Sequence, residues 1–222
     1  MSAAPRLSVP PSSLAGNDPH GAVVAARAAR DALPLSTRAA LATLLARHRV
    51  LVVPGWNNSG PDHWQSRWQQ EFPTLERVGQ NNWATPDPDD WVRNLDRAVH
   101  ASKRPVVLVA HSLGCVTVAR WAAQAENTWP VVGALLVAPA DVERAEANVA
   151  LQPFAPVARR RLPFTARVVG SSNDPCCSEQ RAREFADAWG AGFNCVHGGG
   201  HINVASGHGH WPQGLALLAW LL

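Results

Sequence analysis

Short apolar runs, many of them β-branched, recur along the chain from residue 49 onward, with amphipathic segments between them. The runs do not alternate with polar residues, so they predict strands that are buried on both faces. These predicted strands cover residues 50–53, 77–79 (a weaker pattern), 106–109, 133–137, 166–169 and 192–196. Helical patterns cover residues 62–72, 89–100, 113–124, 178–189 and 211–222. The alternation predicts a three-layer α/β/α sandwich around a mostly parallel sheet of about five or six strands.

The first 48 residues do not follow this alternation. Residues 1–20 are rich in Pro, Ser, Ala and Gly without an apolar period, which predicts a disordered tail. Residues 21–48 predict a helical N-terminal extension with helices at 22–33 and 36–47, the second capped by Ser36. The sequence therefore divides into a tail, this extension and one α/β domain over residues 49–222.

The run VVLVAHSLGCVTVA at 106–119 changes from a strand pattern to a helix pattern at Ser112. A serine on a sharp turn between a buried strand and a helix exposes its Oγ, as in a nucleophile elbow of Gly-x-Ser-x-Gly form. Here Ala110 and Gly114 occupy the two glycine positions, which we expect to crowd against each other. The pentapeptide alone leaves two interpretations open, a nucleophile or a serine that caps the following helix.

Composition and charge indicate which classes of binding partner the sequence does not predict. The 222 residues carry a formal net charge of +3 with dispersed basic residues, which does not indicate nucleic-acid binding. No apolar run approaches the roughly 18 residues that span a bilayer. The four cysteines have neither disulfide-framework nor paired zinc-ligand spacing, and they predict reduced thiols in a cytoplasm. Cys115 is interpreted as a buried packing residue, and Cys176 and Cys177 as loop lining.

Two polar loops supply partners for Ser112. Asp174 lies in a loop after strand 166–169, and His201 follows strand 192–196 behind three glycines. Because parallel strands bring their carboxyl ends to one sheet edge, we expect both side chains near Ser112. A serine needs a histidine to take its proton and an acid to orient that histidine, and the order Ser, acid, His is one known solution.

Alternatives exist for both partners. His197, His208 and His210 lie near His201, but no ligand pair sits on a helix with metal spacing, so no metal is predicted. We favour His201 because the glycine run allows the chain to bend over the sheet edge. Asp141 also follows a strand and is the competing acid, unless it caps a helix ahead of Val142. The stiff Asp174-Pro175 loop favours Asp174, and the choice stays open.

The oxyanion of a tetrahedral intermediate needs two donors. One expected donor is the backbone N–H of Leu113, and the second is the N–H of Trp56, with Asn57 as second choice, in the glycine-containing loop after strand 50–53. Asn57 and Trp64 are candidate pocket residues. Trp64, Trp68 and Trp91 also suit amphipathic packing.

Five motifs occur in an order that resembles a known family: VVPGWNNSGPDHWQSRW at 52–68, AHSLGC at 110–115, LLVAPADVER at 135–144, SSNDPCCS at 171–178 and GGGHIN at 198–203. They resemble the small bacterial α/β-hydrolases of the retinoblastoma-binding-protein-nine-like serine hydrolase family. The likeness covers residue 49 to the C-terminus. It implies an α/β-hydrolase fold with little or no lid, and a triad of Ser112, Asp174 and His201.

These observations predict a serine hydrolase that cleaves small carboxylic esters through an acyl-enzyme intermediate, without a cofactor or metal. The expected partner is a small-molecule ester, with no nucleic acid or membrane involved, and the sequence does not indicate an oligomeric state. The alternative is a binding or regulatory protein on a hydrolase scaffold with weak or incidental activity.

Overall fold

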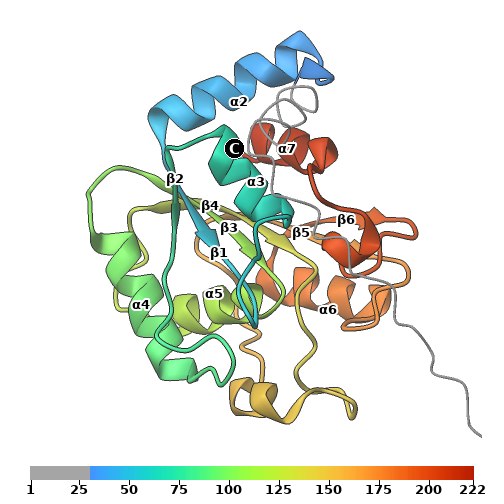
Figure 1. Ribbon diagram of the computed structural model, residues 1–222. Coiled ribbons are helices and arrows are strands. Elements are labelled where there is room, and N and C mark those ends of the chain that lie inside the picture. The colour runs from blue at the N-terminus through green and yellow to red at the C-terminus, as the bar shows by residue number, and fades with distance from the viewer. Residues whose placement is uncertain (1–30) are drawn as a thin grey trace, which may run out of the picture.

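The computed structural model describes residues 31–222, and six parallel strands form its centre (Figure 1). The strand order is β2-β1-β3-β4-β5-β6, and every neighbouring pair is parallel. The strands are β1 (Arg49–Val53), β2 (Leu75–Arg77), β3 (Val106–His111), β4 (Val131–Val137), β5 (Thr165–Ser171) and β6 (Gly192–Val196). The predicted α/β/α sandwich is thus confirmed.

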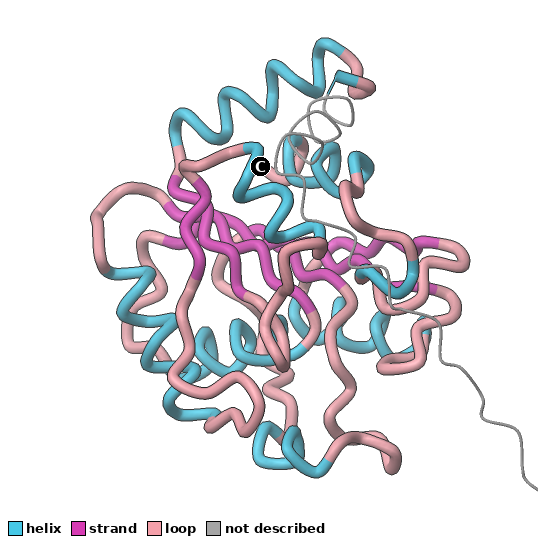
Figure 2. Tube along the Cα trace, viewed as in Figure 1, coloured by secondary structure: helices cyan, strands magenta, loops and turns pink. Residues whose placement is uncertain are grey.

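Helices cover both faces of this sheet (Figure 2). The helices α4, α5 and α6 lie on one face, and α2, α3 and α7 lie on the other. Their bounds are α2 (Leu35–Arg47), α3 (Trp64–Glu71), α4 (Pro88–His100), α5 (Leu113–Gln124), α6 (Glu179–Trp189) and α7 (Pro212–Ala219), with short 3-10 helices at Val149–Phe154 and Val204–Ser206. Each strand therefore leads into a connection that packs on the sheet, as the alternating sequence pattern predicts.

The unbroken apolar runs bury both faces of the strands. Leu51 and Leu108 belong to the core under α4, α5 and α6, whereas Val52 and Val107 belong to the core under α2, α3 and α7. All four side chains have an exposed fraction of 1% or less. Because successive side chains of a strand point to opposite faces, one run of sequence supplies both cores.

Several element ends differ from the predicted ranges. Strand β2 begins at Leu75, which pairs with Val50. Beyond the end of the strand, the N–H of Val78 donates a hydrogen bond to Val52 O. Helix α2 begins at Leu35 after Pro34, so Ser36 is not its cap. Pro34 occupies the N-cap position with φ of −53° and makes no side-chain capping bond.

The described part of the N-terminal extension belongs to the domain core. Leu41 and Leu44 of α2 are buried in the same cluster as Leu215 and Leu218 of α7. The predicted tail at 1–20 and most of the predicted helix at 22–33 lie outside the described residues. None of the helices in the described range is both long and apolar enough to cross a membrane.

Candidate active site

Ser112 stands on the turn between β3 and α5. Its backbone has φ of 55° and ψ of −121°, a conformation that residues other than glycine rarely adopt. Its N–H donates to Val137 O at 3.0 Å, which ties the turn to β4. Ser112 occupies the N-cap position of α5, yet its side chain makes no capping bond. The capping interpretation is therefore wrong for the hydroxyl, which the turn leaves available for other partners.

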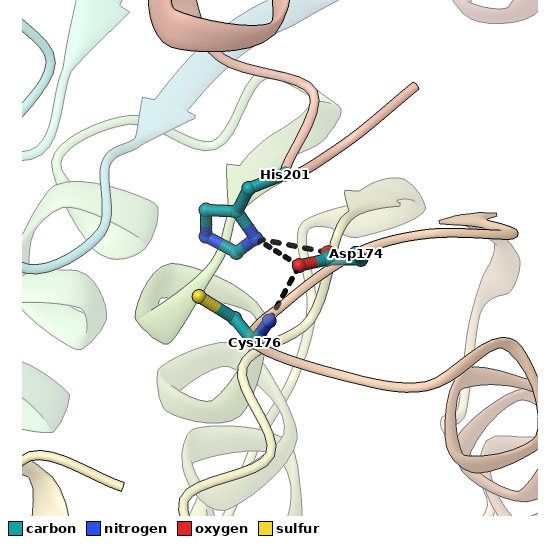
Figure 3. Close-up of side chains that lie close together, drawn as sticks. All are labelled: Asp174, Cys176 and His201. Atoms are coloured by element: carbon teal, nitrogen blue, oxygen red, sulfur yellow. Dashed lines mark hydrogen bonds and ion pairs between the residues drawn. The ribbon is translucent and has the colours of Figure 1, made fainter. Parts of the chain in front are cut away.

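A chain of hydrogen bonds runs from this hydroxyl through an imidazole to a carboxylate. Ser112 Oγ lies 2.9 Å from His201 Nε2. His201 Nδ1 lies 3.0 Å from Asp174 Oδ1 and 2.9 Å from Oδ2 (Figure 3). The N–H of Cys176 donates to Asp174 Oδ1 at 2.7 Å and holds the carboxylate in place. The structure thus brings together three residues that the sequence places at the ends of β3, β5 and β6.

The carboxylate shapes the titration of the imidazole. Burial alone lowers the pKa of His201, but the hydrogen bond and negative charge of Asp174, together with the neighbouring Cys176, raise that pKa to about 9. In the neutral ring, an Nδ1–H that faces Asp174 leaves the Nε2 lone pair toward Ser112 Oγ. This tautomer is the one that a general base at Ser112 requires.

The competing acid, Asp141, has other partners. Its Oδ2 forms an ion pair with Arg181 Nε at 3.3 Å, and its Oδ1 accepts the N–H of Glu143 at 3.1 Å. The latter bond closes a turn and does not begin a helix. Asp141 makes no bond to His201 within residues 31–222, so the geometry favours Asp174 as the partner of the imidazole.

Two glycines allow the elbow to pack against the end of β1. A Cβ on Gly114 would lie 2.3 Å from Val53 O and 2.7 Å from Pro54 O, and a Cβ on Gly55 would lie 2.8 Å from Ser112 Cβ. The closest contacts at Gly114 therefore come from the backbone of Val53 and Pro54 at the end of β1, whereas the sequence pattern predicted crowding against Ala110. Ala110 is fully buried in the core, where its methyl group fits.

Substituting Gly114 with alanine should separate α5 from β1. We expect the free energy of unfolding to fall by about 1–3 kcal/mol, because the new methyl group meets carbonyl oxygens that belong to a paired strand. Urea denaturation measures the change. Gly60→Ala is the matched control, since a Cβ there meets no atom within 4 Å. Equal losses in the two variants would contradict the packing argument.

Two backbone donors lie at the elbow and in the adjoining loop after β1. In the described range, the N–H groups of Leu113 and Trp56 donate to no protein acceptor. Leu113 opens α5, where the first N–H groups of a helix lack intrahelical partners. The N–H of Asn57, the second choice from sequence, donates to Trp83 O at 3.0 Å and is not available. Leu113 and Trp56 therefore stand as the candidate oxyanion donors.

A cavity of about 230 Å³ opens beside the hydroxyl. Its walls come from the loop after β1, the elbow, the segment 140–151 and the loops that carry Cys176 and His201. Trp56 and Asn58 line it, whereas the predicted pocket residues Asn57 and Trp64 do not. Trp64 is fully buried, donates to Ile202 O at 2.9 Å and packs against Trp68 and Trp211. It is a core residue, because helix α3 turns that face toward α7.

Sequence reasoning missed two buried histidines at this site. The ring of His111 lies 4.9 Å from that of His201 and 4.7 Å from that of His63. His111 Nε2–H donates to His201 O at 2.9 Å and so holds the loop that carries the base. Burial lowers the pKa of His111 well below its usual value and lowers that of His63 to about 3, so both rings are neutral. The sequence offered one signal for each histidine: His111 directly precedes the elbow serine, and His63 directly precedes Trp64.

The other candidates from sequence lie apart from the triad geometry. His197 is exposed, His208 bonds to Ser206 Oγ at 3.2 Å, and His210 contacts Arg67 at 3.2 Å. Cys115 is buried in the core, and its burial raises the pKa of its thiol, so it suits packing and not attack.

Comparison with known proteins adds a family likeness to this geometry. A family model described as serine hydrolase matches residues 50–220. A YdeN-like hydrolase from Pectobacterium atrosepticum shares 31% identity and a TM-score of 0.74, covering 83% of this chain and 96% of that one. No curated protein matched the chain.

More distant structures share the fold. The ydeN gene product from B. subtilis has 21% identity and a TM-score of 0.64, over 77% of this chain and 96% of that one. Thermogutta terrifontis esterase 2, solved in a form phosphorylated by paraoxon, has 16% identity and a TM-score of 0.56, over 79% of this chain and 82% of that one. These likenesses place the sheet and its helices among α/β-hydrolase folds.

Proposed function

Because the chain belongs to the serine hydrolase family, we propose that it cleaves small carboxylic esters through an acyl-enzyme intermediate. The observation that carries the proposal is the unbroken hydrogen-bond chain from Ser112 through His201 to Asp174, at the wall of a cavity. The three residues are assigned the roles of nucleophile, general base and orienting acid.

The first half of the reaction forms the acyl-enzyme. Ser112 Oγ attacks the ester carbonyl while its proton passes to His201 Nε2, 2.9 Å away. Asp174 stabilises the resulting imidazolium and keeps its ring in place. The oxyanion accepts hydrogen bonds from the N–H groups of Leu113 and Trp56, which have no competing protein acceptor in the described chain. The imidazolium then protonates the leaving alcohol.

The second half releases the acid. A water molecule gives a proton to His201 Nε2 and attacks the acyl carbonyl, and Ser112 Oγ leaves with the proton returned by the imidazolium. The order of proton transfers mirrors acylation, so the same three residues serve both halves.

The size of the cavity supports a small substrate. Its volume of about 230 Å³ lies below the usual ~300–1,000 Å³ of pockets for drug-sized ligands. Trp56, Ala140 and Leu151 give it apolar walls, which suit a short acyl group. A series of model esters with increasing acyl length should therefore show its highest kcat/KM at short chains.

Labelling with a fluorophosphonate tests the proposed nucleophile directly. We expect one adduct, located on Ser112 by mass spectrometry, and none in Ser112→Ala. Labelling that persists in that variant would overturn the assignment of the nucleophile. If a broad panel of short acyl esters shows no turnover above the Ser112→Ala control, the result would instead favour a binding role.

The pH dependence of kcat/KM should follow the imidazole. His201 accepts a proton only in its neutral form, and its pKa is raised to about 9. We therefore expect kcat/KM to rise with pH, to reach half its maximum near pH 9 and to level off only above that pH, because an increasing fraction of His201 is deprotonated. Rates on an aryl ester, corrected with Ser112→Ala for spontaneous hydrolysis, measure the profile. A rate that falls steadily over the same range would contradict the assigned base.

A further inference from the structure

Cys176 lies beside the imidazole and the carboxylate of the site. A carboxylate oxygen of Asp174, the sulfur of Cys176 and a ring nitrogen of His201 all lie within 4.8 Å of one another. Figure 3 shows the Cys176 side chain directed toward the His201 ring from the loop that also carries Asp174. Between residues 31 and 222, this is the one group of three such side chains with a metal-binding arrangement.

The thiol is also accessible from the cavity. Cys176 is partly exposed and lines the cavity next to Ser112. Cys115 and Cys177 are buried, and burial, together with nearby carboxylates, raises the pKa of the Cys177 thiol well above its usual value. Cys195 is partly exposed but pairs with Glu179, away from the cavity. A metal ion that enters the cavity therefore meets Cys176 and not the other thiols.

We propose that Zn²⁺ binds to Asp174, Cys176 and His201 and reversibly inhibits the enzyme. The inhibitory part rests on the proposed esterase function, whereas the metal site stands on geometry alone. One thiolate, one imidazole and one carboxylate are ligand types that zinc takes, and three protein ligands leave a fourth position for water. The thiolate disfavours the harder ions Mg²⁺ and Ca²⁺, which prefer oxygen ligands.

The spacing requires only a small adjustment. Zinc bonds of about 2.0–2.3 Å place tetrahedral ligand atoms roughly 3.5 Å apart, against separations of up to 4.8 Å here. Rotation of the single Cα–Cβ bond of Cys176 moves its sulfur, while its backbone N–H keeps its bond to Asp174. The carboxylate and imidazole already face each other at 2.9 Å.

Bound zinc would remove the general base. The Cys176 thiol releases its proton to solvent on binding, and the imidazole offers its nitrogen lone pair to the ion. A neutral imidazole has one such lone pair, and its other nitrogen carries a proton. Whichever ring nitrogen binds the ion, His201 can no longer accept the proton of Ser112, so acylation stops.

Calorimetric titration with ZnCl₂ tests the site without any assay of activity. We expect one site per full-length chain, an affinity reduced by about tenfold or more in Cys176→Ser, and no detectable binding of MgCl₂. Cys195→Ser is the matched control, since it removes a partly exposed thiol outside the cavity, and it should bind zinc as the wild type does. Equal zinc affinity in wild type and Cys176→Ser would overturn the site.

Ester hydrolysis tests the inhibition. Each variant is compared with its own zinc-free rate, so a change in basal activity does not enter the comparison. We expect the wild-type rate to fall as zinc saturates the site measured by calorimetry, and to recover when a chelator is added. Cys176→Ser should need about tenfold more zinc for the same inhibition. A full rate in wild type at saturating zinc would overturn inhibition. Zinc binding without any ester hydrolysis would overturn the proposed function and leave the metal site standing.

Discussion

Replacing Ser112 with alanine is expected to lower kcat for a short aryl ester by about 10⁵-fold or more, which is the largest loss that we predict. The substitution removes the atom that is proposed to form the acyl-enzyme, and no other hydroxyl lies within hydrogen-bond distance of His201 Nε2 in the described residues. We expect the residual rate to come from the proposed oxyanion donors and the cavity, which stay in place. Steady-state kinetics under substrate saturation measure the loss.

The fold should survive this change. Ser112 Oγ contacts His201 and makes no capping bond to α5, so its removal leaves the backbone pairing intact. Ser172→Ala is the control, because Ser172 is exposed and its hydroxyl accepts the N–H of Gly198 without contacting Ser112, His201 or Asp174. We expect that variant to keep its rate within a few-fold of wild type. If Ser112→Ala retained most of the wild-type kcat with an unchanged Tm, the nucleophile would have to be another residue.

Substituting Asp174 with asparagine is expected to lower kcat by about 10⁴-fold, the second largest effect. An amide at this position loses the negative charge that stabilises the His201 imidazolium, and its NH₂ group favours the tautomer with the proton on Nε2. That tautomer places a proton toward Ser112 Oγ, where a lone pair is required. Pre-steady-state kinetics should show that the loss lies in acylation.

Asp141→Asn is the matched comparison, since Asp141 was the competing acid in the sequence. Its carboxylate pairs with Arg181 and accepts the N–H of Glu143, so we expect a cost below about tenfold. A larger loss in Asp141→Asn than in Asp174→Asn would reverse the assignment. A rise of the His201 pKa in Asp174→Asn, followed by NMR, would also contradict it, because the carboxylate is what raises that pKa.

The strands of the sheet were predictable because each strand is marked by the residues of its own short segment. Continuous runs such as 106–109 and 133–137 are apolar at every position, and this pattern is typical of strands covered on both faces. The strand-end positions of Asp174 and His201 followed from the same rule, since parallel strands share one carboxyl edge. Residue order and strand ends therefore brought both side chains into consideration, but the choice between Asp174 and Asp141 needed the hydrogen bonds of the structure.

The site features that the sequence did not predict depend on contacts between segments that are far apart along the chain. Trp64 packs against Trp211, which lies 147 positions later, and an amphipathic pattern does not show which face a helix buries. The N–H of Asn57 donates to Trp83 O, and that acceptor lies in a loop whose sequence has no regular pattern. His111 and His63 meet only because β1 and β3 are neighbours in the sheet. Each of these facts required the tertiary structure.

The pairing of β1 with β3 bears on the positions of the two candidate oxyanion donors. In this ladder Val53 stands opposite Ala110, and each donor, Trp56 and Leu113, follows its own member of that pair by three residues. The strand register thus carries the Trp56 loop and the start of α5 to the same edge of the sheet. The cavity wall at 140–151 belongs to a different connection. A change in that wall therefore leaves the β1–β3 pairing, and with it the two candidate donors, in place.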